Sequence, residues 1–297
     1  MRPLAFVPII FSLLALILTF LLLFAGSKTS VLADFPIVTL NTTNLFDASL
    51  NTTIVMAMPN TVALINSLPI PDIAGGSDTV ARKLGIHDFY TINMLTFCEG
   101  YRISNTTDTR KPPMKTATTN CSTTKAFYAF DLAQILQDEI TTAGHADVNI
   151  TKLGFPNAVT TGLRAFHSAR EGVFILYCLS IGFTTLTLLF SLAAVVTTEH
   201  SGLSLVTALS GVLAFLSTAF ASSIVTVLAS RGSALVNRVG GGSVGLTAAP
   251  GGRFLALTWV ATAALGVCFF AGVGGCVAAR RAVAAKEGVD ESGEGEK

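Results

Sequence analysis

The sequence predicts a membrane all-α protein, namely a four-transmembrane-helix bundle with a mixed ectodomain that contains a small β-sheet between helices 1 and 2. The first observation is that four long stretches carry no charged side chain, and each is long enough to cross a bilayer, which needs about 20 residues. These stretches are Pro3–Ser27, Gly172–Thr198, Ser201–Ser230 and Phe254–Ala279. The second observation is that about 150 polar residues separate the first two stretches and contain five Asn-x-Ser/Thr sequons and two cysteines.

The sequons decide which side of the membrane this polar segment occupies. All five fall within it, at Asn41, Asn51, Asn105, Asn120 and Asn149. About two would be expected by chance from the Asn, Ser and Thr content, and sequons are used only on the lumenal side of the secretory pathway. The segment is therefore predicted to be a glycosylated extracellular domain. Asn120 is expected to be a poor acceptor, because its sequon contains a cysteine that is predicted to be bridged.

The predicted topology has both termini in the cytoplasm. Its segments are residues 1–3 (cytoplasmic N-terminus), 4–25 (span 1), 26–172 (glycosylated extracellular ectodomain), 173–196 (span 2), 197–202 (cytoplasmic turn), 203–229 (span 3), 230–253 (extracellular Gly-rich loop), 254–278 (span 4) and 279–297 (acidic cytoplasmic tail). The first apolar run exceeds the usual 7–15 residues of a signal-peptide core, so we expect an uncleaved span; the alternative is a signal peptide that ends near Ala33. Basic residues flank span 4 on both sides and do not decide the orientation.

The cysteines agree with an extracellular segment. Cys98 and Cys121 are the only two in it, whereas the other three lie in the predicted spans. An even pair in an oxidising compartment is typical of a disulfide, which here would close a loop of about two dozen residues and stabilise the fold by about 3 kcal/mol. The alternative is two free thiols.

Local patterns predict the elements of the ectodomain. Aromatic and β-branched residues favour a strand over Phe89–Tyr101 that ends in a Gly turn, and a Pro/Thr/Asn-rich composition favours a loop over Lys111–Thr124. Asp131 is expected to cap a short helix with an apolar face. The apolar run Ile54–Ile73 is broken by prolines and is not a fifth span. A helix that begins at Asn157 is expected to continue into span 2.

Spans 3 and 4 carry small residues at four-residue spacing, which lets helix backbones approach closely in lipid. The two stripes are Ser210, Ala214, Thr218 and Ser222 in span 3, and Ala264, Cys268, Gly272 and Cys276 in span 4. Packing within one bundle is the favoured interpretation, and a dimer seam is the alternative. For Cys276, near the end of span 4, simple packing is the favoured interpretation, and S-palmitoylation is the alternative. The tail after Lys286 is acidic and Gly-rich and is expected to be disordered.

Several kinds of chemistry are not expected from the sequence. The middle of every span lacks an ionisable residue, which argues against pumps, coupled carriers and intramembrane proteases. His87, His145, His167 and His200 are scattered, so neither a metal site nor catalytic or cofactor-binding residues are predicted. Gly240–Gly245 matches GxGxxG but lacks the βαβ setting that this motif requires, and is expected to be a flexible linker. The ectodomain has balanced charge and no basic face for nucleic acid.

One set of motifs resembles the fungal Sur-seven/PalI family of four-span membrane proteins. The motifs are Phe97-Cys98-Glu99-Gly100-Tyr101, then Asn120-Cys121-Ser122, then Phe127–Asp131, and finally Gly162–Phe166 and Arg170–Tyr177. The family is distantly similar to claudins, which implies a left-handed four-helix bundle topped by a small β-sheet. The Trp-containing motif of the claudin first loop is missing from this ectodomain, so a paracellular pore function is not implied.

The resemblance implies a non-enzymatic structural role in static cortical patches (eisosome-associated domains) of the fungal plasma membrane, with effects on wall organisation, endocytosis and sphingolipid balance. The implied partners are membrane lipids, including those of sphingolipid- or sterol-rich domains, other patch membrane proteins and the cell wall; no cofactor and no nucleic acid are implied. PalI-type members instead assist ambient-pH signalling, and a short tail favours the patch type. An auxiliary subunit of a channel or transporter is the third alternative.

Overall fold

The computed structural model describes residues 6–28, 32, 34–46, 79–103, 115–128, 130–146, 148–149, 157–196, 201–243 and 245–294. Every structural statement below concerns this part of the chain. The segment Ile54–Ile73 and the sequons at Asn51 and Asn105 lie outside it.

The chain divides into two compact units. The first, called here the helical unit, comprises Met1–Leu23, Val173–Ser223 and Ala256–Lys297, and the second, the sheet unit, comprises Phe24–Gly172 and Ile224–Leu255. Four helices are long and apolar enough to cross a membrane. The candidate spans are Phe6–Phe24, Phe166–Ala194, Leu205–Gly241 and Gly252–Gly274, so the expected four-span class is confirmed.

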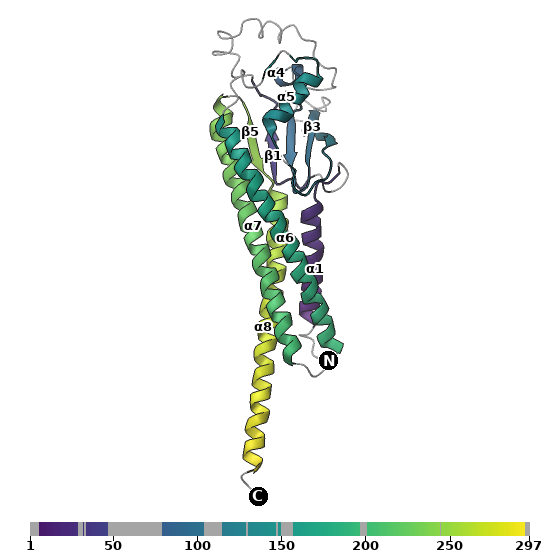
Figure 1. Cartoon of the computed structure of the whole chain (residues 1–297), viewed down its shortest axis with the longest axis vertical. Helices are drawn as coiled ribbons and strands as arrows, with labels where there is room; N and C mark the ends of the chain where they lie inside the picture. The colour runs from purple at the N-terminus through teal and green to yellow at the C-terminus, as the bar shows by residue number, and fades with distance from the viewer. Residues whose placement is uncertain are drawn as a thin grey trace, which may run out of the picture. The chain divides into compact units, whose positions relative to one another are not determined.

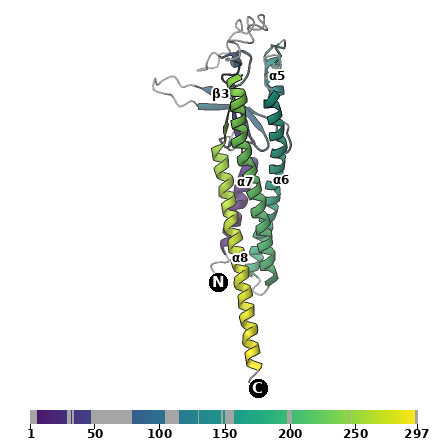
Figure 2. The same cartoon turned by 90° about the vertical axis from the view of Figure 1, so that its left-hand side faces the viewer.

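The helical unit is built from α1 (Phe6–Phe24) and from parts of α6 (Asn157–Val196), α7 (Ser201–Ser243) and α8 (Gly252–Glu294). Figures 1 and 2 both show α6, α7 and α8 as neighbours. Small residues form the centre of this unit, where Ala15, Ala214, Ala264 and Leu265 pack together with Phe11, Phe183 and Phe215. The stripe of span 3 is buried along its whole length, and Ala264 and Cys268 of the other stripe are buried too. Packing within one bundle is therefore confirmed.

The sheet unit contains a five-stranded antiparallel sheet in the order β4-β3-β2-β1-β5. Its strands are β1 (Val38–Asn41), β2 (Phe89–Ile92), β3 (Phe97–Ile103), β4 (Lys115–Cys121) and β5 (Thr247–Pro250). The short helices α4 (Val80–Lys83) and α5 (Leu132–Thr142) complete the unit. In Figure 1 the yellow-green β5 lies beside the purple β1. This pairing brings together two strands that are far apart in the sequence.

Two predictions about the ectodomain strands were wrong. The expected single strand over Phe89–Tyr101 is a hairpin, because the chain turns between β2 and β3, where the Asn93 amide donates to the Thr96 carbonyl oxygen at 2.9 Å. The expected loop over Lys111–Thr124 contains β4, whose Thr-rich sequence pairs with β3. Partner strands override local composition here, because β propensity depends on the neighbouring strand.

Two predictions about the later segments were also wrong. The expected Gly-rich loop over 230–253 is helical up to Ser243 and then forms β5, so the flexible linker expected at Gly240–Gly245 is largely helix. The tail expected to be disordered after Lys286 continues α8 as far as Glu294. By contrast, the uninterrupted helix from Asn157 into span 2 is confirmed.

Candidate functional site

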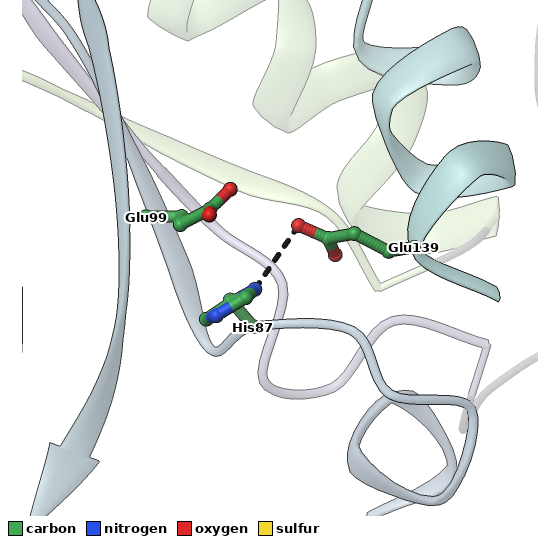
Figure 3. A group of neighbouring side chains, drawn as sticks. All are labelled: His87, Glu99 and Glu139. Atoms are coloured by element: carbon green, nitrogen blue, oxygen red, sulfur yellow. Dashed lines mark hydrogen bonds and ion pairs between the residues drawn. The ribbon is translucent and has the colours of Figure 1, made fainter. Parts of the chain in front are cut away.

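The sheet unit contains an open cleft of about 490 Å³. It is lined by Phe97 and Glu99 of β3, by Gly85 and His87 of the loop before β2, and by Ile135, Asp138, Glu139, Thr142 and Ala143 at α5. Four of these side chains, His87, Glu99, Asp138 and Glu139, carry groups that can bind protons or metal ions. His87, Glu99 and Glu139 lie close together and come from three different elements (Figure 3).

His87 is held by the loop that leads into β2. Arg82 and Asp88 form a buried ion pair across this loop, with the Arg82 Nε donating to Asp88 Oδ1 at 2.8 Å. The Arg102 amide donates to Asp88 Oδ2 at 2.7 Å, which ties the loop to β3. The His87 ring lies against the Tyr101 ring, with centroids 4.6 Å apart. These contacts fix both the backbone and the ring of His87.

Glu99 is placed by an irregularity in β3. The register with β4 shifts between Glu99 and Gly100, and such a bulge re-aims side chains. Gly100 is required at this point, because a Cβ there would lie 2.2 Å from the Ala117 carbonyl oxygen. The Asn120 side-chain amide of β4 donates to Glu99 Oε1 at 3.2 Å. Strand β3 thus presents the Glu99 carboxylate on the face that lines the cleft.

Glu139 is placed by α5. This helix begins at the predicted cap, because Asp131 Oδ1 accepts hydrogen bonds from the amides of Ala133 and Gln134 at 3.1 and 3.3 Å. Leu132, Leu136 and Ile140 are buried, and they set which face of the helix packs inward. Glu139 lies next to Ile140 and is only 15 % exposed. The cap and the apolar stripe therefore direct the Glu139 carboxylate toward the sheet.

The three side chains converge in the cleft. His87 Nδ1 lies 3.0 Å from Glu139 Oε1, as the dashed line in Figure 3 shows, and Tyr90 donates its hydroxyl proton to Glu139 Oε2. Glu99 points into the same space, and one ligand atom from each of His87, Glu99 and Glu139 lies within 4.8 Å of the others. We call these three residues the His-Glu-Glu cluster. It brings two carboxylates and one imidazole together in a partly buried position.

The cluster changes the proton affinity of its members. Burial lowers the pKa of His87, but the hydrogen bond and charge of Glu139, with the charges of Glu99 and Asp88, outweigh burial and raise it. Burial and the nearby Glu139 raise the pKa of the Glu99 carboxyl, although the charge of His87 opposes them. The folded sheet unit therefore binds protons at His87 and Glu99 more tightly than an unfolded chain would.

A disulfide lies directly beside the cluster. Cys98 and Cys121 are joined, with their Cα atoms 4.0 Å apart, and they are register partners on β3 and β4. The next pair in the register is Glu99 with Asn120. The bond thus holds Asn120 opposite the carboxylate to which its amide donates.

Two other described sequon residues, Asn41 and Asn149, are not among the residues that line this cleft. Asn41 ends β1, and its Oδ1 accepts hydrogen bonds from the Thr43 amide and hydroxyl at 3.1 and 2.8 Å. Asn149 is exposed, as a glycan acceptor should be. The Cys276 side chain lies outside the described residues, so its palmitoylation stays a prediction. Glycosylation of the five sequons also stays a prediction.

The pentapeptide Phe97–Tyr101 that carried the family resemblance has a structural explanation. It forms β3, in which Cys98 makes the disulfide, Glu99 joins the cluster, Gly100 permits the bulge and Tyr101 contacts His87. Sequence reasoning identified this strand but missed His87 and Glu139. They lie 52 residues apart in the chain, and the periodicity of α5 around Ile140 was the only available signal for Glu139.

Comparison with known proteins places the chain in a family. Neither a curated protein nor a solved structure gives a significant match. The family profile described as SUR7/PalI family matches residues 4–271, which is most of the chain and includes all four candidate spans up to Ala271. The four apolar helices and the small antiparallel sheet are consistent with a claudin-like arrangement. The protein is therefore a multi-pass membrane protein that belongs to the SUR7/PalI family.

Proposed function

We propose that this protein is a non-enzymatic structural organiser of cortical patches in the fungal plasma membrane, of the eisosome-associated kind, and that it acts in wall and membrane organisation. The observation that carries the proposal is the nature of the buried polar groups in the helical unit. Among its described residues these are serine and threonine hydroxyls, together with the Tyr177 hydroxyl. Proton- and ion-coupled transporters usually place ionisable side chains at such positions.

The hydroxyls bond to one another between helices. Tyr177 and Thr258 lie 2.5 Å apart, Ser222 lies 2.7 Å from Thr258, and Ser180 bonds to Thr218. Such hydrogen bonds stabilise the association of helices in a membrane. The unit is thus suited to hold a fixed shape beside lipids and neighbouring membrane proteins, which are the partners that the proposal assigns to it.

The proposal places residues 26–172 outside the cell, facing the wall, with both termini in the cytoplasm. Glycosidase treatment tests this orientation: it should increase the gel mobility of the native protein. Replacing Asn41, Asn51, Asn105, Asn120 and Asn149 together with Gln should abolish the shift. Among single variants, Asn149→Gln should remove one step and Asn120→Gln none, because Asn120 lies in a β-strand beside the disulfide. A glycosidase-insensitive protein from the native host would contradict the orientation.

Live-cell imaging tests the patch role. A tagged copy should label immobile plasma-membrane patches that recover slowly after photobleaching. Deletion should alter sensitivity to wall stress or sphingolipid inhibitors more than growth at alkaline pH. Uniform fluorescence with rapid recovery would contradict the proposal.

A second candidate is an accessory role in ambient-pH signalling, as in PalI-type proteins. The observation that favours it is the His-Glu-Glu cluster, in which the pKa values of two groups are raised. Burial lowers the pKa of His87, but the hydrogen bond and charge of Glu139 and the other nearby carboxylates outweigh it, whereas burial and the nearby Glu139 raise the pKa of Glu99. A selective alkaline growth defect after deletion, which Glu99→Gln reproduces and Asp138→Asn does not, would favour this candidate over the first.

A further inference from the structure

The His-Glu-Glu cluster has the composition and the geometry of a metal-ligand set. It consists of one imidazole nitrogen and two carboxylate oxygens from three separate elements, which differs from a chance row of acidic residues on one helix. Its ligand atoms lie within 4.8 Å of one another. Ligand atoms that lie about 2.1 Å from a tetrahedral ion are about 3.4 Å from one another. Side-chain rotations that move each ligand atom by roughly 1 Å would therefore bring the three atoms to the distances of a metal site.

The surroundings of the cluster orient the carboxylates without neutralising them. The Glu139 carboxylate contacts His87 and accepts a hydrogen bond from the Tyr90 hydroxyl, and the Glu99 carboxylate accepts one from the Asn120 side-chain amide. Neutral hydrogen-bond donors behind the ligands are typical of metal sites, where outer groups fix the ligand geometry. Two adjacent carboxylates thus face one imidazole, and a dication would balance their charge.

The cleft also leaves room for the remaining ligands of an ion. It is open, with a volume of about 490 Å³, and both His87 and Glu139 retain some exposure, 16 and 15 %. An ion held by three protein ligands keeps a coordination position for water on the open side. Access and hydration therefore do not prevent binding.

We propose that His87, Glu99 and Glu139 form a binding site for a single divalent transition-metal cation, for which Zn²⁺ is the best match. Imidazole favours Zn²⁺ over Mg²⁺ and Ca²⁺, which prefer all-oxygen sets, and a set of three protein ligands is common for zinc with an open position. His87 Nδ1 faces Glu139, so this nitrogen is the ligand, and its proton passes to solvent on binding. The ion would join α5 to β3 and to the loop before β2.

Zinc titration of the full chain tests the site. The protein is expressed with a tag free of histidine, kept in detergent micelles or nanodiscs, treated with a chelator and titrated with Zn²⁺ by calorimetry, with metal content measured by mass spectrometry. We expect one Zn²⁺ per chain. Glu99→Gln and Glu139→Gln should each weaken binding by at least about 10-fold, since even outer-shell partners change metal affinity by about 10–100-fold.

Asp138→Asn is the matched control, because Asp138 lines the same cleft on the same helix, carries the same charge and stands outside the ligand set. It should leave the affinity within about threefold of the native value. An equal loss in Asp138→Asn and Glu99→Gln would show a diffuse charge effect and would overturn the proposal. The absence of saturable binding at one equivalent would do the same, and would leave the cluster as a hydrogen-bonded contact only.

A measurement on the native protein avoids dependence on variant folding. Diethyl pyrocarbonate modifies accessible imidazoles, and modified peptides are quantified by mass spectrometry. Saturating Zn²⁺ should protect His87 several-fold and leave His145, a histidine of the same unit outside the cluster, unchanged. Mg²⁺ at the same concentration should protect neither. Unchanged modification of His87 in the presence of Zn²⁺ would contradict direct ligation.

Discussion

The two units of this protein bury polar groups in opposite ways. In the described helical unit, the buried polar side chains are hydroxyls, and several also bond to a carbonyl four residues back, as Thr187 does to Phe183 at 2.8 Å. The sheet unit instead buries Arg82, Asp88 and Arg170 almost completely. It is also the unit that contains the disulfide.

The difference follows from the backbone of each unit. Helix interiors satisfy their own backbone groups, so few carbonyl oxygens remain to solvate a cation, and a hydroxyl is the most polar group that can satisfy itself locally. Turns in the sheet unit leave carbonyl oxygens free. Arg170 donates to two of them, the Met94 oxygen at 3.1 Å and the Tyr128 oxygen, and its guanidinium lies 3.8 Å from the Tyr128 ring centroid. Loss of a buried counter-charge is therefore expected to destabilise the sheet unit strongly, whereas the described part of the helical unit buries no such charged pair.

The largest effect is expected from breaking the buried ion pair of the sheet unit. Asp88→Asn leaves Arg82, which is 4 % exposed, without its counter-charge, and should lower the free energy of unfolding by about 3–5 kcal/mol. Pulse proteolysis of the full chain in urea measures this change. The control is Asp34→Asn, since Asp34 pairs with Arg253 at 3.3 Å in an exposed position and should contribute less than about 1 kcal/mol. Equal losses in the two variants would refute the comparison.

Removal of the disulfide should rank next. Replacing Cys98 and Cys121 together by Ser opens a loop with a sequence separation of 23 residues, which should cost about 3 kcal/mol. The same proteolysis experiment under non-reducing conditions measures the loss. Cys178→Ser, at an exposed free cysteine, serves as the control and should change nothing. A double variant as stable as the native chain would show that the hydrogen bonds between the strands suffice.

In the helical unit, packing should matter more than any single hydroxyl. Ala214→Leu adds bulk at a fully buried position and should destabilise by about 1–3 kcal/mol. Ser222→Ala removes bonds to Thr258 and Thr262 and should cost only about 0.6 kcal/mol. Thermal unfolding in detergent compares the two, with the exposed Leu216→Ala as a control. A larger loss for Ser222→Ala would reverse the expected order.

The smallest effect should be the pH dependence of the metal-free sheet unit. The folded-state pKa values of His87 and Glu99 are both raised, so the folded chain binds more protons than the unfolded one. The stability contributed by Glu99 begins to fall near pH 4.5, the ordinary pKa of a glutamate, and the stability contributed by His87 begins to fall near pH 6.5, the ordinary pKa of a histidine. Each contribution is lost as the pH rises through the raised pKa of that group in the folded chain.

Urea unfolding at several pH values, with a chelator present, measures this dependence. Glu99→Gln should lose less stability than the native chain as the pH rises, because it removes the carboxyl and lowers the pKa of His87 at the same time. Asp88 and Glu139 also face His87 and remain in both proteins. A native chain that gains stability relative to this variant with rising pH would contradict the sign.

Local and additive signals were sufficient for much of this protein. The four spans follow from uncharged apolar length, the α5 cap from Asp131 and its two amide donors, and the bundle contacts from small residues at Ala214 and Ala264. The cysteine pair followed from a count within one segment. The cap depends on residues close together in the chain, and the spans depend on the partition of each side chain between water and lipid. The cysteine pair and the small-residue stripes needed only a count or a regular spacing, with no knowledge of the partner segment.

Only the tertiary structure decided the sheet and the cluster. Strand β5 pairs Thr247–Pro250 with β1, more than two hundred positions earlier, and no local pattern in a Gly-rich segment indicates that partner. His87 meets Glu139 because the loop before β2 and helix α5 pack on the same sheet, although 52 residues separate them. Strand pairing satisfies backbone groups of any sequence, so its register depends on which segments the surrounding helices and turns bring together. The chemistry of the cleft is therefore decided by the tertiary fold, whereas the membrane-spanning character of the protein is decided by the sequence.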